Sequence, residues 1–177
     1  MVSAARVDTA TTSTAYIGIG SNLEGPLEQV RRAREALAQL PDTRFVGISP
    51  LYRNPAVGPG DQPDYVNAVA VIQTLLEPHV LFDALQAIEA NQGRRRGALR
   101  WQARTLDLDL LVYGDRTIHD QHLTVPHPNM QERAFVLKPL LDLAPDLDVP
   151  GLGPVAGLLS AAPDGQLRRI DDNGDVL

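Results

Sequence analysis

The sequence contains no cysteine, which excludes a disulfide framework, a thiol nucleophile and a thiolate zinc site. No apolar run approaches the roughly 18 residues needed to cross a bilayer. Residues 1–14 lack the apolar segment of a secretory signal. Aromatic residues make up only 5% of the chain, which disfavours a sheet that stacks nucleic-acid bases. These absences predict a cytoplasmic protein with no membrane partner and no nucleic-acid partner.

The length of 177 residues lies within the range of about 100–200 residues that is usual for one domain. Residues 1–14 are small and polar, so we expect a disordered N-terminal tail. Residues 15–177 should then form a single domain, in which residues 146–177 are an acidic C-terminal extension. We expect this domain to be a monomer.

Hydrophobic periodicity predicts the regular elements. Strands are expected over residues 15–20, 45–51, 65–73 and 105–113, and helices over residues 26–40 and 78–93, with a long loop over 52–64. The order β-α-β-β-α-β predicts an α+β fold, namely a ferredoxin-like sandwich with an antiparallel sheet and both helices on one face.

The rest of the chain predicts C-terminal additions to this sandwich. A weak hairpin is expected over residues 117–125, and a short helix and a last strand after Pro154. Asn129 and Glu132 have the spacing of a capping box, which predicts a third helix that Pro139 limits.

Asp107 and Asp109 lie in the strongest predicted strand. Side chains alternate between the faces of a strand, so these carboxylates share one face while Leu106, Leu108 and Leu110 share the other. Paired hard oxygen ligands without cysteine favour Mg²⁺. The alternative is a solvent-facing strand that happens to carry two acids.

Five arginines and no acid lie in residues 94–104, directly before this strand. Arg94, Arg96 and Arg104 are suited to bind phosphate oxygens, and cations beside a metal site are typical of phosphoryl transfer. A solvated charge run is the alternative. Trp101, in the same segment, either covers a ligand or docks the segment on the core.

Two further segments carry side chains that suit a ligand. His127, between two prolines, and Arg133 are candidates for phosphate binding, although a lone histidine is more often structural. Tyr65 and Asn67 share a strand face, where an aromatic ring and an amide suit a flat heterocycle. Ordinary cross-strand packing is the alternative for this pair.

Taken together, five motifs resemble the 6-hydroxymethyl-7,8-dihydropterin pyrophosphokinase family of folate synthesis. They are AYIGIGSNL (15–23), DQPDYVN (61–67), RTLDLDL (104–110), VPHP (125–128) and ERAF (132–135). The resemblance extends from about Ala15 to Pro145. It implies that Mg-ATP gives its terminal pyrophosphate to the hydroxymethyl oxygen of the pterin and that AMP is released.

The resemblance also implies a role for individual residues. Asp107 and Asp109 would be ligands of two Mg²⁺ ions and, with Arg94 and Arg104, would form the catalytic set. The implied pterin site comprises Asn54, Pro55, Val57, Tyr65, Asn67, Trp101 and Phe135. The implied ATP site comprises Gln86, Glu89, Arg96, Leu110, Thr124, His127 and Arg133.

Two other hypotheses belong to different functional classes. One is a non-catalytic pterin- or nucleotide-binding module, for which the only support is Gln102, where the family usually has a small residue. The other is an RNA-binding ferredoxin-like domain, which would need exposed aromatic residues on neighbouring strands. Formation of AMP in step with pterin consumption would eliminate the first.

Overall fold

The structure is a computed structural model that describes residues 11–57, 61–93 and 105–177. Its first part comprises β1 (Ser13–Ser21), α1 (Pro26–Ala38), β2 (Thr43–Ile48), β3 (Leu51–Asn54), β4 (Tyr65–Thr74), α2 (Pro78–Asn91) and β5 (Asp107–Tyr113). Its second part comprises β6 (Ile118–His119), β7 (Thr124–Val125), the 3₁₀ helix Met130–Glu132, α3 (Ala134–Leu143), β8 (Asp148–Val149), β9 (Gly153–Pro154), α4 (Val155–Ala161) and β10 (Arg168–Ile170).

The main sheet has the order β10-β3-β4-β1-β5, with β2 also paired to β4. Its strand pairs are all antiparallel. In the β-α-β-β-α-β part, the second and third strands pair with each other and the first strand lies between the third and the fourth. This arrangement is ferredoxin-like, which confirms the predicted α+β fold. In the residues described, no helix is long and apolar enough to cross a bilayer.

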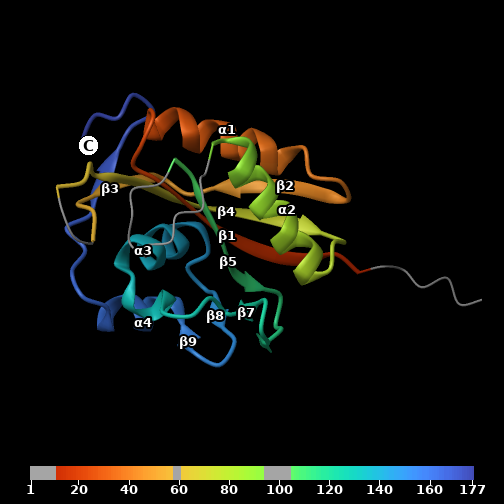
Figure 1. Ribbon diagram of the computed structural model, residues 1–177. Helices are drawn as coiled ribbons and strands as arrows, with labels where there is room; N and C mark the ends of the chain where they lie inside the picture. Colours follow the sequence, from red (N-terminus) through yellow and green to blue (C-terminus); the bar gives the residue numbers. More distant parts are fainter. Residues whose placement is uncertain (1–10, 58–60, 94–104) are drawn as a thin grey trace, which may run out of the picture.

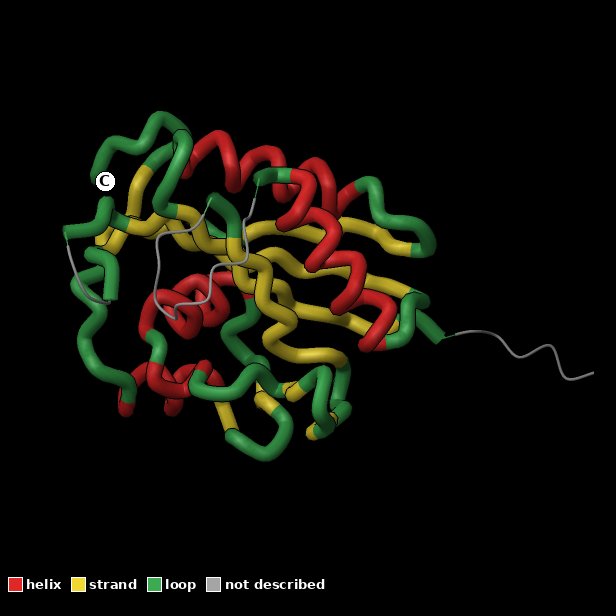
Figure 2. Tube along the Cα trace, in the orientation of Figure 1, coloured by secondary structure: helices red, strands yellow, loops and turns green. Residues whose placement is uncertain are grey.

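Helices cover both faces of the sheet. Figure 1 and Figure 2 show α1 and α2 on one face and α3 and α4 on the opposite side. The alternation along β4 explains both layers: Val66, Ala68, Ala70 and Ile72 are buried in the core under α1 and α2, while Val69 is buried in a second core under α3. The C-terminal additions therefore cover part of the face that the first two helices leave free.

A polar contact ties α3 to this second face. Tyr52 of β3 donates a hydrogen bond to Asp142 of α3, and Lys138 forms an ion pair with the same carboxylate. Burial and the hydrogen bond to Asp142 raise the pKa of Tyr52. The tie holds α3 over β3 and leaves the ends of β4 and β5 next to the start of the helix.

The strand predicted over residues 45–51 is two strands, and the predicted loop over 52–64 begins only after Asn54. Pro50 lies at the break between β2 and β3 and has no N–H to donate to a ladder. Ser49 keeps the chain attached there, since its N–H donates to the Val69 carbonyl and its hydroxyl accepts from the Val69 N–H. The break lets β2 and β3 pair with different halves of β4.

The predicted start and end of the third helix are wrong. Asn129 has a left-handed φ of 66° and makes no capping bond, so a 3₁₀ turn follows it and α3 begins only at Ala134. Pro139 lies inside α3 instead of ending it. Leu137 and Leu140 are fully buried in the second core, and their packing offsets the hydrogen bond that proline cannot donate.

Candidate functional site

A cavity of about 380 Å³ lies between the second face of the sheet and the start of α3. Nine of the residues predicted from the sequence line it: Asn54, Val57, Tyr65, Asn67, Asp107, Asp109, His127, Arg133 and Phe135. They come from β3, β4, β5, α3 and the segments next to them. The structure thus brings the predicted heterocycle-binding, carboxylate and cationic residues together at one place.

Two glycines of β1 form the floor of this cavity. Gly20 is paired with Asn67 of β4 on one side and with Asp107 of β5 on the other, and Gly18 is paired with Asp109. Opposite residues of antiparallel strands point to the same face, so a side chain on Gly20 would project towards Asn67 and Tyr65, whereas one on Gly18 would meet Leu111. Sequence reasoning missed this role. The available signal was the alternation of these glycines with buried Ile17 and Ile19.

Asp109 lies close to a histidine and an arginine in the cavity. Its carboxylate lies 3.6 Å from His127 Nε2 and 3.7 Å from the Arg133 guanidinium. The three side chains are 20–29% exposed, so their interactions are less screened than those of surface pairs. His127 is held by its main-chain N–H, which donates to the Leu111 carbonyl over 2.9 Å. Its Nδ1 is buried and has no hydrogen-bond partner in the part of the chain that the structure describes.

The donors at the start of β5 fit Mg²⁺. Asp107 and Asp109 both line the cavity and supply hard carboxylate oxygens. Among the residues that the structure describes, no group of three or more His, Asp or Glu side chains could hold a metal ion. Mg²⁺ is usually held by one or two carboxylates together with substrate phosphates and water, not by a cage made of protein alone. A pair of aspartates in an open cavity is therefore a suitable partial ligand set.

Aromatic and amide groups form the other end of the cavity. Tyr65 and Phe135 both line it, from β4 and α3. The guanidinium carbon of Arg133 lies 5.9 Å from the centre of the Phe135 ring, which places a cation beside the apolar end. Asn67 and Asn54 are buried and hydrogen-bonded to each other over 2.6 Å.

Five residues of the predicted sites do not line the cavity: Pro55, Gln86, Glu89, Leu110 and Thr124. Glu89 of α2 is buried, and its Oε1 accepts a hydrogen bond from the Leu108 N–H over 2.7 Å. Gln86 lies half-buried on the same helix. The Leu110 side chain is part of the first core, so only its main chain is available to a ligand. Arg94, Arg96, Trp101 and Arg104 lie outside the described residues.

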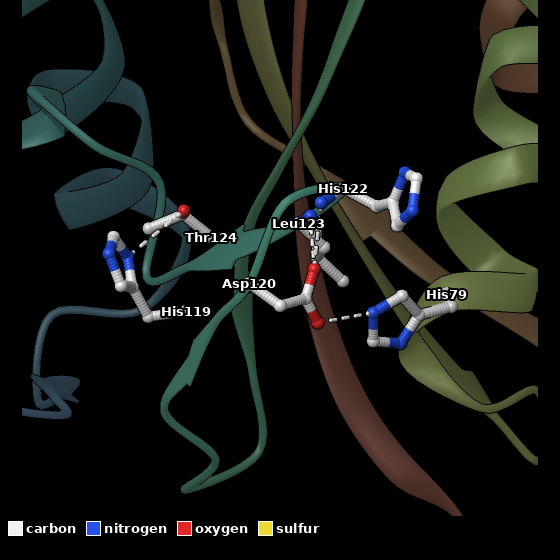
Figure 3. Close-up of polar contacts among 6 residues, drawn as sticks. All are labelled: His79, His119, Asp120, His122, Leu123 and Thr124. Carbon is white, nitrogen blue, oxygen red and sulfur yellow. Dashed lines mark hydrogen bonds and ion pairs between the residues drawn. The ribbon is translucent and has the colours of Figure 1, made fainter.

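Thr124 belongs to the β6–β7 hairpin, which leads directly to His127. Figure 3 shows its hydroxyl near His119 Nδ1, at 3.4 Å, and Asp120 directed towards His79 of α2. Hydrogen bonds from the main-chain N–H groups of His122 and Leu123, and then the contact with His79, lower the pKa of Asp120 to about 2. The hairpin is therefore closed by its own aspartate, and the contact between Asp120 and His79 joins it to α2.

Solved structures share this fold. A crystal structure of Plasmodium falciparum HPPK-DHPS A437G/K540E with pterin and p-hydroxybenzoate matches 97% of this chain with a TM-score of 0.73 and 14% identity. A structure described as HPPK-DHPS in complex with substrates matches 94% with a TM-score of 0.72 and 10% identity. This chain spans about half the length of either. At these identities the likeness shows the fold alone.

The sequence comparisons show the family. The model of 7,8-dihydro-6-hydroxymethylpterin-pyrophosphokinase (HPPK) matches residues 16–145. A protein of Pseudomonas aeruginosa named 2-amino-4-hydroxy-6-hydroxymethyldihydropteridine pyrophosphokinase is 51% identical over 88% of this chain and 95% of its own length. A protein of the same name from Haemophilus influenzae is 46% identical over 89% and 98%. The chain belongs to the HPPK family, which confirms the family and the enzyme class predicted from the sequence.

Proposed function

We propose that this protein transfers the pyrophosphoryl group of Mg-ATP to the hydroxymethyl oxygen of 6-hydroxymethyl-7,8-dihydropterin, as a step of folate biosynthesis. The oxygen forms a bond to the β-phosphorus of ATP, the bond from that phosphorus to the α–β bridging oxygen breaks, and AMP leaves. The hydroxyl proton is released. The observation that supports this best is one cavity that holds aromatic and amide groups at one end and Asp109, His127 and Arg133 at the other.

The apolar end suits the pterin. Tyr65 and Phe135 offer ring faces to a flat heterocycle, and Asn67 offers an amide to its hydrogen-bonding edge. The main chain around Asn54, Pro55 and Val57 completes this end in the proposal. Gly20 pairs with both Asn67 and Asp107, so a pterin held here would lie next to the acids of β5.

The charged end suits the triphosphate. Arg133 and His127 both lie next to Asp109, and both can turn to phosphate oxygens when a metal ion takes that carboxylate. Asp107 and Asp109 would hold Mg²⁺, which when bound neutralises phosphate charge and draws electron density from the reacting phosphorus. No side chain is assigned as a general base.

The predicted site residues that do not line the cavity also have roles in this proposal. Gln86, Glu89, Leu110 and Thr124 would meet the nucleotide, Leu110 through its main chain. Arg94, Arg96 and Arg104 would hold the phosphates, and Trp101 would cover the substrates. We also propose two Mg²⁺ ions, a single domain over residues 15–177, a monomer and a cytoplasmic location.

The test is to identify the nucleotide product. Purified protein is incubated with ATP, MgCl₂ and 6-hydroxymethyl-7,8-dihydropterin, and the nucleotides are separated by chromatography. We expect AMP to form in step with pterin consumption, and no AMP without the pterin. ADP as the product would indicate ordinary phosphoryl transfer, and binding of both substrates without AMP would indicate a binding module; either result contradicts the proposal.

A further inference from the structure

The amide groups of Asn54 and Asn67 have their orientation fixed by one main-chain carbonyl. Asn54 Nδ2 donates to the Pro55 oxygen over 2.9 Å. A carbonyl can only accept, so the NH₂ of Asn54 has to face it. The oxygen of Asn54 is then turned towards Asn67, whose Nδ2 donates to it over 2.6 Å. Since the NH₂ group of Asn67 faces Asn54, the amide oxygen of Asn67 lies on the side away from Asn54.

That oxygen lies over Gly20, on the floor of the cavity. A Cβ atom added to Gly20 would come within 2.9 Å of Asn67 Oδ1 and 3.8 Å of the Tyr65 ring. The first distance is too short for real atoms, so any larger residue at this position would displace the amide. Gly20 therefore supplies the space in which an oriented Asn67 oxygen meets the cavity.

We propose that Asn54 is a positioning residue for ligand recognition: through the Pro55–Asn54–Asn67 hydrogen bonds it presents the carbonyl oxygen of Asn67 to N–H donors on the edge of the pterin. This inference rests on the proposed function and deepens it. Asn54 is 3% exposed and Asn67 is 6% exposed, so water has little access to replace the bond between them. A site that fixes an acceptor in this way selects a ligand edge that carries a donor and disfavours one that does not.

Three strands make this arrangement precise. Asn54 ends β3, Asn67 lies within β4, and Gly20 is the register partner of Asn67 in β1. Tyr65, the register partner of Asn54, lines the same cavity. The donor–acceptor order is thus determined inside the sheet, before any ligand is bound.

The test uses a matched pair of variants, Asn54→Thr and Asn54→Val, which have the same shape and differ only in the hydroxyl. A hydroxyl can accept from Asn67 and donate to Pro55, whereas valine can do neither. Dissociation constants for the pterin and for ATP are measured by calorimetry. We expect Asn54→Val to weaken pterin binding about 10-fold with little effect on ATP, and Asn54→Thr to restore most of the loss.

A second readout separates orientation from general structural damage. A pterin that carries a methyl group in place of the hydrogen on the ring nitrogen facing Asn67 cannot donate to Asn67 from that nitrogen. The native protein should therefore discriminate strongly against it. In Asn54→Val the Asn67 amide can rotate and offer its NH₂ to the ligand, so the ratio of the two dissociation constants should fall. Equal ratios and equal pterin affinities in native protein, Asn54→Thr and Asn54→Val would overturn the proposal.

Gly20→Ala provides an independent variant if Asn54→Val does not fold. Its methyl group should displace the Asn67 oxygen and weaken pterin binding at least several-fold. Gly47→Ala in β2 is the control, since its added Cβ would meet only ordinary contacts at 3.8 Å. Native pterin affinity in Gly20→Ala would contradict the proposed placement of Asn67. If the native protein itself bound pterin but formed no AMP, the proposed function would fail while this inference remained testable by binding.

Discussion

The two ends of the cavity are built on different parts of the sheet. The pterin end uses strands with neighbours on both sides, β4 and β1, and its amides orient one another across β3 and β4. The phosphate end uses β5, which is the last strand of the sheet, and the short β6–β7 hairpin. Residues of an interior strand are held by hydrogen bonds to a neighbouring strand on each side. An edge strand has such a neighbour on one side only, so its residues need contacts from outside the sheet. The structure supplies that support from α2.

Two polar side chains of α2, Glu89 and His79, contact this edge in addition to the apolar packing of the helix on β5. Glu89 accepts from the Leu108 N–H, on the residue that separates Asp107 from Asp109. His79, near the start of the same helix, contacts Asp120 of the hairpin. One helix therefore positions both the carboxylates and the segment that leads to His127. The phosphate end should accordingly be more sensitive to distant substitutions than the pterin end.

The largest effect on activity is expected from substitution of Asp109. We expect Asp109→Ala to lower kcat by about two orders of magnitude or more, because the metal ligand and the partner of Arg133 and His127 are lost together. Pterin affinity should change little, since that end of the cavity does not depend on β5. Steady-state kinetics and pterin binding are the measurements.

The control for this prediction is Asp115→Ala, which removes the same charge from an exposed position just after β5. It should keep native activity. If Asp109→Ala retains native turnover, the magnesium assignment is wrong. If Asp109→Ala loses pterin affinity as well as turnover, pterin binding depends on the phosphate end and the two ends of the cavity do not act independently.

A smaller effect is expected from substitution of Glu89, which accepts a hydrogen bond from the main chain between Asp107 and Asp109. Glu89→Leu leaves the buried Leu108 N–H without an acceptor, which should lower the free energy of unfolding by about 1–3 kcal/mol. We also expect it to raise the Mg²⁺ concentration needed for half-maximal activity, because the peptide between the two aspartates is no longer held. Denaturant unfolding and Mg²⁺ titrations of activity test both effects.

Glu89→Gln is the matched control, since its side-chain oxygen can still accept from Leu108. It should retain most of the stability and the native Mg²⁺ dependence. Equal Mg²⁺ dependence in Glu89→Leu and native protein would show that the hydrogen bond does not position the acids. A rise in the KM for ATP with unchanged Mg²⁺ dependence would support only the proposed contact of Glu89 with the nucleotide and not its role in positioning the acids.

Sequence reasoning succeeded where the signal is periodic. The alternation of Asp107 and Asp109 with leucines predicted their shared face of β5, and the same alternation predicted the shared face of Tyr65 and Asn67 in β4, because period two is a property of any strand. The motif resemblance added Asn54, Val57 and Phe135, and the structure brings these three together with the six residues that residue patterns had indicated.

The failures concern groups whose role depends on a neighbour far along the chain. Gly20 matters because Asn67 and Asp107 lie on either side of it, which the sequence of β1 alone does not contain. The role of Asn54 depends on its hydrogen bond to Asn67, which lies 13 residues further along the chain. Pro139 is tolerated inside α3 because tertiary packing of the helix overrides a local rule.

The smallest effect is expected from substitution of Asp120 in the β6–β7 hairpin, and it concerns the stability of the fold. The lowered pKa of Asp120, about 2, arises from hydrogen bonds to the ionised carboxylate, chiefly those from the main-chain N–H groups of His122 and Leu123. A folded-state pKa below the ordinary value means that the group stabilises the fold above its ordinary pKa and that this contribution is lost as the pH falls towards 2. Asp120→Ala should therefore lower Tm slightly near neutral pH, and its difference from the native protein should narrow below about pH 4. A Tm difference that stays constant or widens on acidification would contradict this sign. A fall in pterin affinity without a change in ATP affinity would contradict the assignment of the hairpin to the phosphate end.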